Sequence, residues 1–256
     1  MNNKLTQLFQ DKNKNLLNVY CTAGYPKKGS TPEVLLALQD NGVDMIEVGM
    51  PYSDPIADGP VIQQSNMAAI ENGMTIQFLF EQLNSVKDSI TVPLIMMGYL
   101  NPVLQYGLEK FCEDAATAGI SGIILPDLPM YEFEEVYAPI FKKHNLSFIF
   151  LITPQTSAER IKKADKLSSG FLYAVSSSAT TGSNSNTEDK TAYFERIARM
   201  DLKNPLMIGF GINNKATFET ASSYAAGAII GSAYIKALRE NNDVKTATST
   251  FIQTIR

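Results

Sequence analysis

The sequence predicts an α/β fold, a (β/α)8 TIM barrel that forms a single domain over residues 1–256, and three observations support this prediction. Short apolar or β-branched runs alternate with amphipathic stretches of about 10 to 16 residues, as in the repeated βα units of a parallel sheet. Eight such runs occur in 256 residues, and barrels of this class commonly have about 250 residues around one core. No linker or change of composition marks a second domain.

The eight predicted strands are separated by segments with helical periodicity. Residues 32–39 and 111–118, for example, carry apolar residues at three- and four-residue spacing, and Ala-Gly or Asn-Gly pairs mark the helix ends. The strands are expected at about residues 18–23, 44–50, 93–99, 122–127, 147–153, 171–176, 205–211 and 227–232.

An open, doubly wound sheet is the alternative arrangement of such units. It normally has a Gly-x-Gly-x-x-Gly turn after its first strand, whereas this chain has Gly-Tyr-Pro-Lys-Lys-Gly after Ala23. In a barrel, active sites lie at the carboxyl ends of the strands and in the loops that follow them. The regions of interest are therefore residues 51–60 after the second strand, residues 177–190 after the sixth, and the ends of the last two strands.

The composition narrows the range of partners. The chain has 22 Lys and Arg against 26 Asp and Glu, a net charge of −4, and 45% hydrophobic residues. Because it lacks a cluster of basic residues, nucleic acid and anionic membranes are not expected as partners. Residues 1–18 are polar, and no segment approaches the roughly 20 apolar residues that a membrane helix needs, so we expect a cytoplasmic protein.

The cysteines and the histidine exclude several kinds of chemistry. Cys21 and Cys112 are far apart in sequence and are expected to be buried thiols, with no indication of a metal site. His144 is the only histidine, and its Lys-Lys-His-Asn context predicts a solvated helix end. Catalysis by a Ser-His-Asp triad, a histidine-rich zinc site and histidine acid–base chemistry are therefore not expected.

Two carboxylates are the candidate catalytic residues. Glu47 lies within an apolar strand, where a charge is costly to desolvate, and Asp58 follows in the loop that leaves the same strand. Glu47 could be a buried glutamate satisfied by backbone amides or by a cation. Two acids in unequal environments at one barrel mouth can instead divide the roles of proton donor and proton acceptor. Asp54, which precedes a proline, is more typical of a turn or cap.

Glycines cluster at the ends of the last three strands. Gly182 follows two threonines, Gly209 and Gly211 flank Phe210, and Gly231 with Ser232 opens the final helical stretch. Backbone amides at a helix N-terminus bind anions, and barrels often bind phosphate near the seventh and eighth loops. The glycines could also serve tight turns alone. We expect a small phosphorylated substrate, and not a nucleoside triphosphate, because the chain has no Gly-x-x-x-x-Gly-Lys-[Ser/Thr] motif.

The remaining candidates concern the interior of the barrel. No lysine falls on a predicted strand, which disfavours Schiff-base chemistry, and a single histidine disfavours metal-assisted aldol cleavage. Proton transfer by carboxylates remains. The residues expected to line the mouth, many of which could equally be ordinary packing, are Tyr20, Met97, Tyr99, Ile124, Leu151, Tyr173 and Phe210.

The segment Ile46-Glu-Val-Gly-Met-Pro-Tyr-Ser-Asp-Pro-Ile-Ala-Asp-Gly59 resembles the signature of the tryptophan synthase alpha subunit family. The resemblance extends over nearly the whole chain. Its further segments are Thr22-Ala-Gly-Tyr-Pro26, Gly98-Tyr-Leu-Asn-Pro102, Pro126-Asp-Leu-Pro129, Thr181-Gly182, Gly209-Phe-Gly-Ile212 and Gly231-Ser232.

The resemblance implies a lyase of tryptophan biosynthesis. Such a barrel cleaves indole-3-glycerol phosphate to indole and glyceraldehyde 3-phosphate by retro-aldol chemistry. It needs no cofactor of its own, and its partner is a pyridoxal-phosphate-dependent beta subunit in an alpha2beta2 heterotetramer. The resemblance makes Glu47 the acid–base residue and Asp58 the carboxylate that binds the indole NH.

Further roles follow from matching positions in the family. Tyr173 matches a residue near the substrate and Glu47, and Thr181 matches one on the sixth loop that contacts Asp58 on closure. Tyr20, Met97, Ile124, Leu151 and Phe210 are expected to contact the substrate. The phosphate site is expected at Gly182, Gly211, Gly231 and Ser232, and the partner interface or second loop at Pro51, Asp54, Tyr99 and Asn101.

The chain departs from the family at three positions. Ser177 stands where a bulkier residue is common, Ala179 where glycine is common, and Tyr20 where phenylalanine is frequent. Alanine restricts the backbone more than glycine does, so Ala179 bears on the closure of the sixth loop and not on the chemical residues. Two alternatives to the lyase are another phosphate-binding barrel acting on a sugar phosphate, and a catalytically weak barrel that mainly activates its partner.

Overall fold

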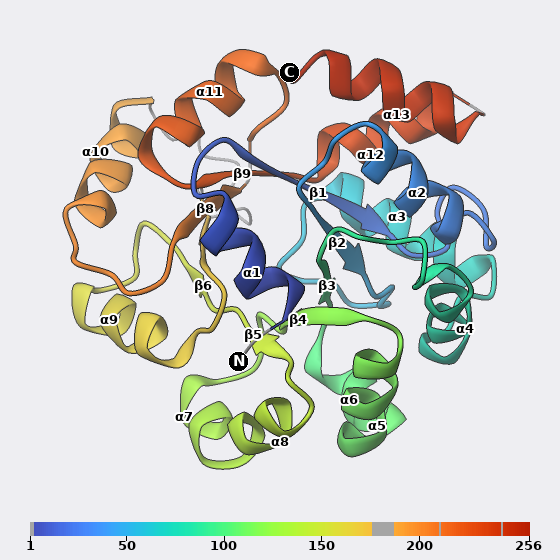
Figure 1. The fold of residues 1–256 in the computed structure, drawn as a ribbon, viewed down its shortest axis with the longest axis horizontal. Coiled ribbons are helices and arrows are strands. Elements are labelled where there is room, and N and C mark those ends of the chain that lie inside the picture. Colours follow the sequence, from blue (N-terminus) through green and yellow to red (C-terminus); the bar gives the residue numbers. More distant parts are fainter. Residues whose placement is uncertain (1–2, 176–186, 210, 242) are drawn as a thin grey trace.

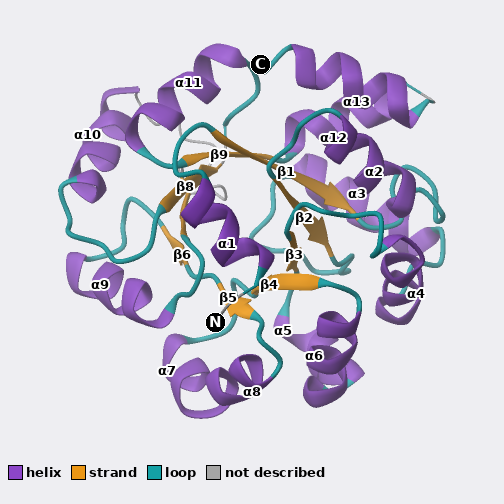
Figure 2. Cartoon of the chain, in the orientation of Figure 1, coloured by secondary structure: helices purple, strands orange, loops and turns teal. Residues whose placement is uncertain are grey.

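Parallel strands form a ring with helices outside it (Figure 1 and Figure 2). The computed structural model describes residues 3–175, 187–209, 211–241 and 243–256. In these residues, nine strands neighbour one another in the order β5-β4-β3-β2-β1-β9-β8-β7-β6, and all the paired strands are parallel. The strands are β1 (Leu16–Thr22), β2 (Met45–Gly49), β3 (Leu94–Met97), β4 (Ile120–Ile124), β5 (Ser147–Phe148), β6 (Leu151–Ile152), β7 (Leu172–Val175), β8 (Leu206–Gly209) and β9 (Gly227–Ile230).

The ring closes through the segment that contains β5 and β6. The backbone N–H of Ile149 donates to Ile123 on one side at 3.0 Å, and that of Tyr173 donates to Phe150 on the other at 3.1 Å. The two short strands are therefore the two halves of the predicted fifth strand. Each of the eight predicted strands is present, and the predicted (β/α)8 barrel is confirmed.

Apart from α1, the described helices lie around the outside of the ring (Figure 2). Several begin at capping side chains: Thr75 accepts from Phe78 and Ser157 from Arg160. No helix in the described part of the chain is both long and apolar enough to cross a membrane. The helices are α1 (Lys4–Asp11), α2 (Thr31–Asp40), α3 (Pro60–Glu71), α4 (Ile76–Val86), α5 (Leu100–Tyr106), α6 (Leu108–Thr117), α7 (Met130–Glu132), the π-helical turn η1 (Phe133–Tyr137), α8 (Ala138–Lys143), α9 (Ala158–Leu167), α10 (Thr187–Ala198), α11 (Lys215–Tyr224), α12 (Ser232–Glu240) and α13 (Val244–Gln253).

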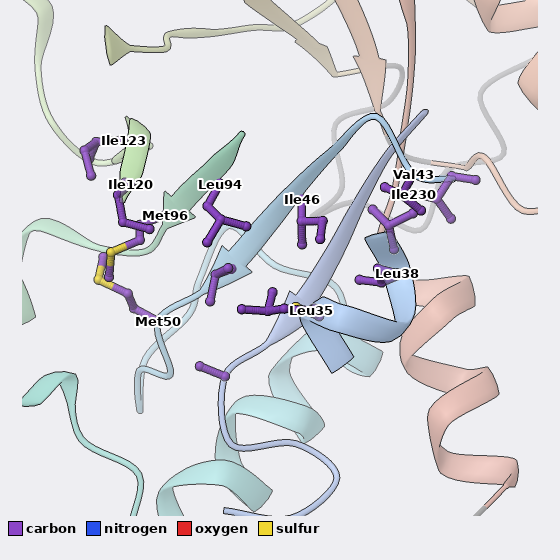
Figure 3. Packing of buried hydrophobic residues seen from close by; sticks show 14 of the residues in the cluster. Leu35, Leu38, Val43, Ile46, Met50, Leu94, Met96, Ile120, Ile123 and Ile230 are labelled. Atoms are coloured by element: carbon purple, nitrogen blue, oxygen red, sulfur yellow. The ribbon is translucent and has the colours of Figure 1, made fainter. Parts of the chain in front are cut away.

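The outer core lies between the strands and the helices. Figure 3 shows Leu35 and Leu38 of α2 beside Ile46 of β2. Ile46 and Val48 both belong to this outer cluster. Because successive side chains of a strand point to opposite faces, Glu47 between them points into the barrel.

The inner core fills the barrel and is closed at the amino ends of the strands by α1, which crosses the ring in Figure 1. Leu5 is fully buried there, and Leu8 and Phe9 pack against the same cluster. The fit is close, because a Cβ atom on Gly170 would lie 2.7 Å from the Leu5 side chain. No element is predicted for this polar segment, so α1 is an addition to the predicted fold.

The cysteines and the histidine give one confirmation and one correction. Cys21 and Cys112 are free and buried, as predicted. His144 ends α8, as predicted, but its side chain is only 16% exposed and lies 3.6 Å from Glu109. It is not the solvated residue that the sequence suggested, because α6 packs against this end of α8.

Candidate active site

A cavity of about 490 Å³ opens at the carboxyl ends of the strands. This volume lies within the range of small-molecule sites. Elements far apart in sequence line it, from β1 and β2 to α12 and α13. The predicted site residues that line it are Tyr20, Glu47, Asp58, Met97, Tyr173, Gly211, Gly231 and Ser232.

Glu47 is the buried acid of this cavity. Its side chain is 0% exposed, and its Oε1 accepts a hydrogen bond of 2.6 Å from Nδ2 of Asn18. Oε2 has no hydrogen-bond partner among the described residues. Burial raises the pKa of Glu47 to about 8, and the bond from Asn18 opposes this rise. At neutral pH the side chain is therefore mostly protonated, as a proton donor must be.

Asp58 is the second acid, in the loop that follows β2. Its Oδ2 accepts a hydrogen bond of 3.0 Å from the hydroxyl of Tyr99, which in turn accepts one from the backbone of Ala57 at 3.0 Å. Burial raises the pKa of Asp58 to about 6, and the bond from Tyr99 opposes this rise. The two pKa values lie on either side of 7, so Asp58 is mostly ionised when Glu47 is mostly protonated.

Two tyrosines of the cavity occupy space that glycines leave free. A Cβ atom on Gly49 would lie 2.0 Å from the Tyr20 hydroxyl oxygen, and one on Gly209 would lie 2.3 Å from that of Tyr173. Tyr20 is also the register partner of Glu47 between β1 and β2. Burial raises the pKa of both tyrosines, with Asp58 the next contribution at Tyr20 and Glu47 at Tyr173. Both phenols therefore remain neutral hydrogen-bonding groups in the pH range of the carboxylates.

The other end of the cavity is formed by the start of α12. Gly231 is its N-cap and Ser232 its first residue. Gly211 has φ +79°, a backbone conformation that favours glycine. Lys236, four residues after Ser232 and so on the same helix face, also lines the cavity. Lys236 is not among the predicted site residues, although its four-residue spacing from Ser232 is a signal that the sequence contains.

Two predicted substrate-binding residues do not line this cavity, and others are not described by the structure. Ile124 is fully buried in the inner core, and Leu151 lines a smaller cavity of about 190 Å³ together with Asp127 and Arg160. Thr181, Gly182 and Phe210, with Ser177 and Ala179, lie outside the described residues.

The four residues predicted near the partner interface or second loop differ in their exposure to solvent. Tyr99 is buried and bonded to Asp58, whereas Asp54 and Asn101 are exposed and Pro51 is half-buried. Asp54 accepts from the neighbouring Ser53 hydroxyl at 2.5 Å, in keeping with the turn role that its sequence suggested. Asn18, which bonds to Glu47, falls within the predicted strand at residues 18–23 but is not among the predicted site residues.

Comparison with known proteins gives one consistent result over the full length. A family model described as tryptophan synthase alpha chain matches residues 6–255. The tryptophan synthase alpha chain of Flavobacterium psychrophilum is 53% identical over 93% of this chain and 94% of its own length. That of Parabacteroides distasonis is 48% identical over 99% of both chains.

Solved structures show the same similarity. The crystal structure of tryptophan synthase subunit alpha from Legionella pneumophila has a TM-score of 0.90 at 32% identity, covering 100% of this chain and 97% of that chain. A chain from the aminoacrylate-bound form of Mycobacterium tuberculosis tryptophan synthase has a TM-score of 0.85 at 30% identity, covering 100% of both.

Proposed function

Because the chain belongs to the tryptophan synthase alpha chain family, which cleaves indole-3-glycerol phosphate to indole and glyceraldehyde 3-phosphate, we propose that Glu47 and Asp58 carry out this cleavage. The enzyme is a carbon–carbon lyase of tryptophan biosynthesis. The observation that carries the proposal is the pair of carboxyl groups in one cavity, with the pKa of Glu47 at about 8 and that of Asp58 at about 6.

Glu47 moves the proton in the proposed mechanism. The protonated carboxyl donates to the indole ring carbon that carries the glycerol chain, and the ring becomes a cation. The resulting carboxylate then removes the proton of the adjacent side-chain hydroxyl. The carbon–carbon bond breaks, its electron pair returns to the ring, and the oxygen becomes the aldehyde of glyceraldehyde 3-phosphate. Glu47 ends the cycle protonated again, so one residue performs both transfers.

Asp58 stabilises the intermediate charge. Its carboxylate binds the indole NH, where positive charge develops when the ring carbon is protonated. A fixed negative group in a cavity shielded from water stabilises that charge more than bulk water does. Its ionisation at neutral pH supports this role.

The phosphate group belongs at the opposite end of the cavity. We place it against Gly211 and the first residues of α12, because backbone N–H groups at the start of a helix and the helix dipole favour an anion. The positive charge of Lys236 lies one turn further along the same helix face. Thr181, Gly182 and Phe210 remain predicted contributors to the substrate site.

Cleavage by the purified chain tests this function. Glu47→Gln is expected to lower indole release from indole-3-glycerol phosphate at least about 1,000-fold, because an amide cannot transfer the proton. Asp58→Asn is expected to lose about 100-fold or more, since a neutral amide does not offset the ring cation. Glu71→Gln, which changes an exposed glutamate of α3, is the matched control and keeps full activity. Near-normal turnover by Glu47→Gln would refute the assigned role.

The partner in this proposal is a beta subunit that holds pyridoxal phosphate, in an alpha2beta2 assembly. Apolar side chains on the loops and helices after β2, β3 and β4 support a docking face there: Ile56 is 75% exposed, Leu104 49% and Tyr131 70%.

The indole-release assay tests the partnership, because added beta subunit is expected to make the release of indole faster. Indole release by the isolated chain would exclude the alternative of a barrel that only activates its partner. Two free cysteines support a cytoplasmic location.

A further inference from the structure

Asn18 is a buried amide in the apolar interior of the barrel. It is 0% exposed and lies on β1, where its register partners are Met45 on β2 and Ile229 on β9. Both partners belong to the inner apolar core. The Nδ2 group of Asn18 donates to Oε1 of Glu47 at 2.6 Å, from one layer below it in the barrel.

Burial of the Asn18 amide in apolar surroundings lowers the stability of the folded protein. A buried polar group without a hydrogen bond is destabilising, and Oδ1 of Asn18 has no partner among the described residues. An aliphatic side chain would fill this position in a strand without that cost. The hydrogen bond to Glu47 is therefore the contact that can explain why this strand carries an amide at position 18.

An amide suits a neighbour whose protonation changes. Its Nδ2 donates to a carboxylate, and after half a turn of the amide its Oδ1 accepts from the O–H of a carboxylic acid. Within this pair of side chains, Oε2 of Glu47 and Oδ1 of Asn18 are both buried and have no hydrogen-bond partner among the described residues. Both forms of Glu47 can therefore be bonded by Asn18 without movement of the backbone.

The other groups that face Glu47 do not duplicate this role. Tyr20 of β1, Tyr173 of β7 and Asp58 of the loop after β2 line the same cavity as Glu47. Cys21 lies on the outer face of β1 and interacts with Glu47 only electrostatically. Burial raises the pKa of Cys21 to about 12 and raises the pKa of both tyrosines, so these three stay neutral. β3 presents the apolar Ile95 as the register partner of Glu47. In the described residues, Asn18 makes the one direct hydrogen bond to Glu47 that the structure records.

We propose that Asn18 is a positioning residue for the cleavage reaction, holding the carboxyl of Glu47 toward the substrate and exchanging donor for acceptor as Glu47 loses and regains its proton. The proposal rests on the acid–base role proposed for Glu47. Asn18 does not touch the substrate in this scheme; it acts through Glu47. It therefore affects turnover and the pH at which Glu47 titrates, and leaves substrate affinity nearly unchanged.

Asn18→Leu tests the proposal, since leucine has a similar size and branching but cannot hydrogen-bond. We expect kcat to fall about tenfold or more, because a hydrogen bond to a charged group is lost, while KM changes by less than about threefold. The pKa of Glu47 is expected to rise by about one unit. It is measured in the free enzyme by the carboxyl infrared band or the 13C signal that Glu47→Gln removes.

Asn18→Asp provides a second variant that keeps the size of the side chain. An ionised aspartate cannot donate to the Glu47 carboxylate and repels it, so the pKa of Glu47 is again expected to rise. Asn18→Asp decides the question if Asn18→Leu does not fold, as judged by circular dichroism and thermal unfolding.

Asn204→Leu is the matched control. Asn204 is also buried, and its amide bonds to Asp165 before the amino end of β8, away from the cavity. It is expected to lose stability without moving the pKa of Glu47. An unchanged Glu47 pKa in the Asn18 variants, or a fall in kcat no larger than that of Asn204→Leu, overturns the inference. If Glu47→Gln itself cleaves normally, the proposed role of Glu47 fails first, and the two failures are thereby distinguished.

Discussion

Glu47 and Asp58 differ in environment more than in chemistry. Both are carboxyl groups on or after one strand, and burial raises the pKa of each. Glu47 receives one amide hydrogen bond inside an apolar barrel, whereas Asp58 receives a phenol hydrogen bond nearer the mouth. The different depths of burial leave one acid protonated and the other ionised at the same pH.

Tyr99 helps to keep Asp58 ionised, and Tyr99→Phe tests this at the scale of one hydroxyl group. Its bond stabilises the carboxylate, so its removal raises the pKa of Asp58 above about 6. The acid limb of kcat/KM is then expected to move to higher pH, with activity at pH 6 reduced about three- to tenfold. A pH profile between 5 and 8 measures this shift. Tyr106→Phe, whose hydroxyl bonds to Asp114 of α6, serves as the control, and an acid limb shared by all three proteins contradicts the prediction.

Side-chain pairings in the site were less predictable than the acids themselves. Glu47 and Asp58 were recognisable because a glutamate within an apolar run and an aspartate in the following loop are conspicuous in sequence. Asn18 is polar within a similar run, but its partner lies 29 positions away. Their contact depends on the register between β1 and β2, which the sequence of either strand alone does not specify.

Helices and strands were predictable where the apolar residues that they bury form a continuous pattern in the sequence. The strands of a parallel sheet are covered on both faces, so each is a continuous apolar run that the sequence displays. The helix α1 differs, because Leu5, Leu8 and Phe9 stand among polar residues and pack only against the closed end of a finished barrel. The division between β5 and β6 also has no counterpart in the continuous run of residues 147–153.

The packing of α1 predicts that it stabilises the barrel without taking part in catalysis. Leu5→Ala removes a fully buried side chain and is expected to lower the free energy of unfolding by about 2–4 kcal/mol. Urea denaturation measures the loss. Gln10→Ala, on the exposed side of the same helix, should change it by less than about 0.5 kcal/mol. Indole release by folded Leu5→Ala should remain normal, because the cavity lies at the other end of the strands; a large fall in kcat would contradict this separation.

At the scale of the whole molecule, the active site makes stability depend on pH. The folded-state pKa of Glu47 is about 8, above its ordinary value of 4.5, so the folded protein binds this proton more tightly than the unfolded chain does. The resulting stabilisation is present in full below pH 4.5 and is lost as the pH rises through 8. Asp58 also stabilises the folded protein at low pH, but by less, because burial raises its pKa only to about 6. Its contribution is lost as the pH rises through 6.

Glu47→Gln is therefore expected to be more stable than the wild-type protein at pH 8. The difference between the two unfolding free energies should grow from pH 5 to pH 8, reaching a few kcal/mol at about 1.4 kcal/mol for each unit of pKa shift. Urea denaturation at pH 5, 6.5 and 8 measures it. Glu71→Gln should follow the wild-type curve, and a constant difference between wild type and Glu47→Gln would show that Glu47 has an ordinary pKa.

The pairing of β1 with both β2 and β9 has a consequence for how the chain is made. A ribosome releases the polypeptide from its amino end, so β1, at residues 16–22, emerges long before β9, at residues 227–230. Until that strand leaves the exit tunnel, the nascent sheet keeps a bare edge on β1, and bare edges recruit strands from other chains. Chaperones that shield a growing polypeptide would therefore have most to do for this enzyme until β9 has been synthesised.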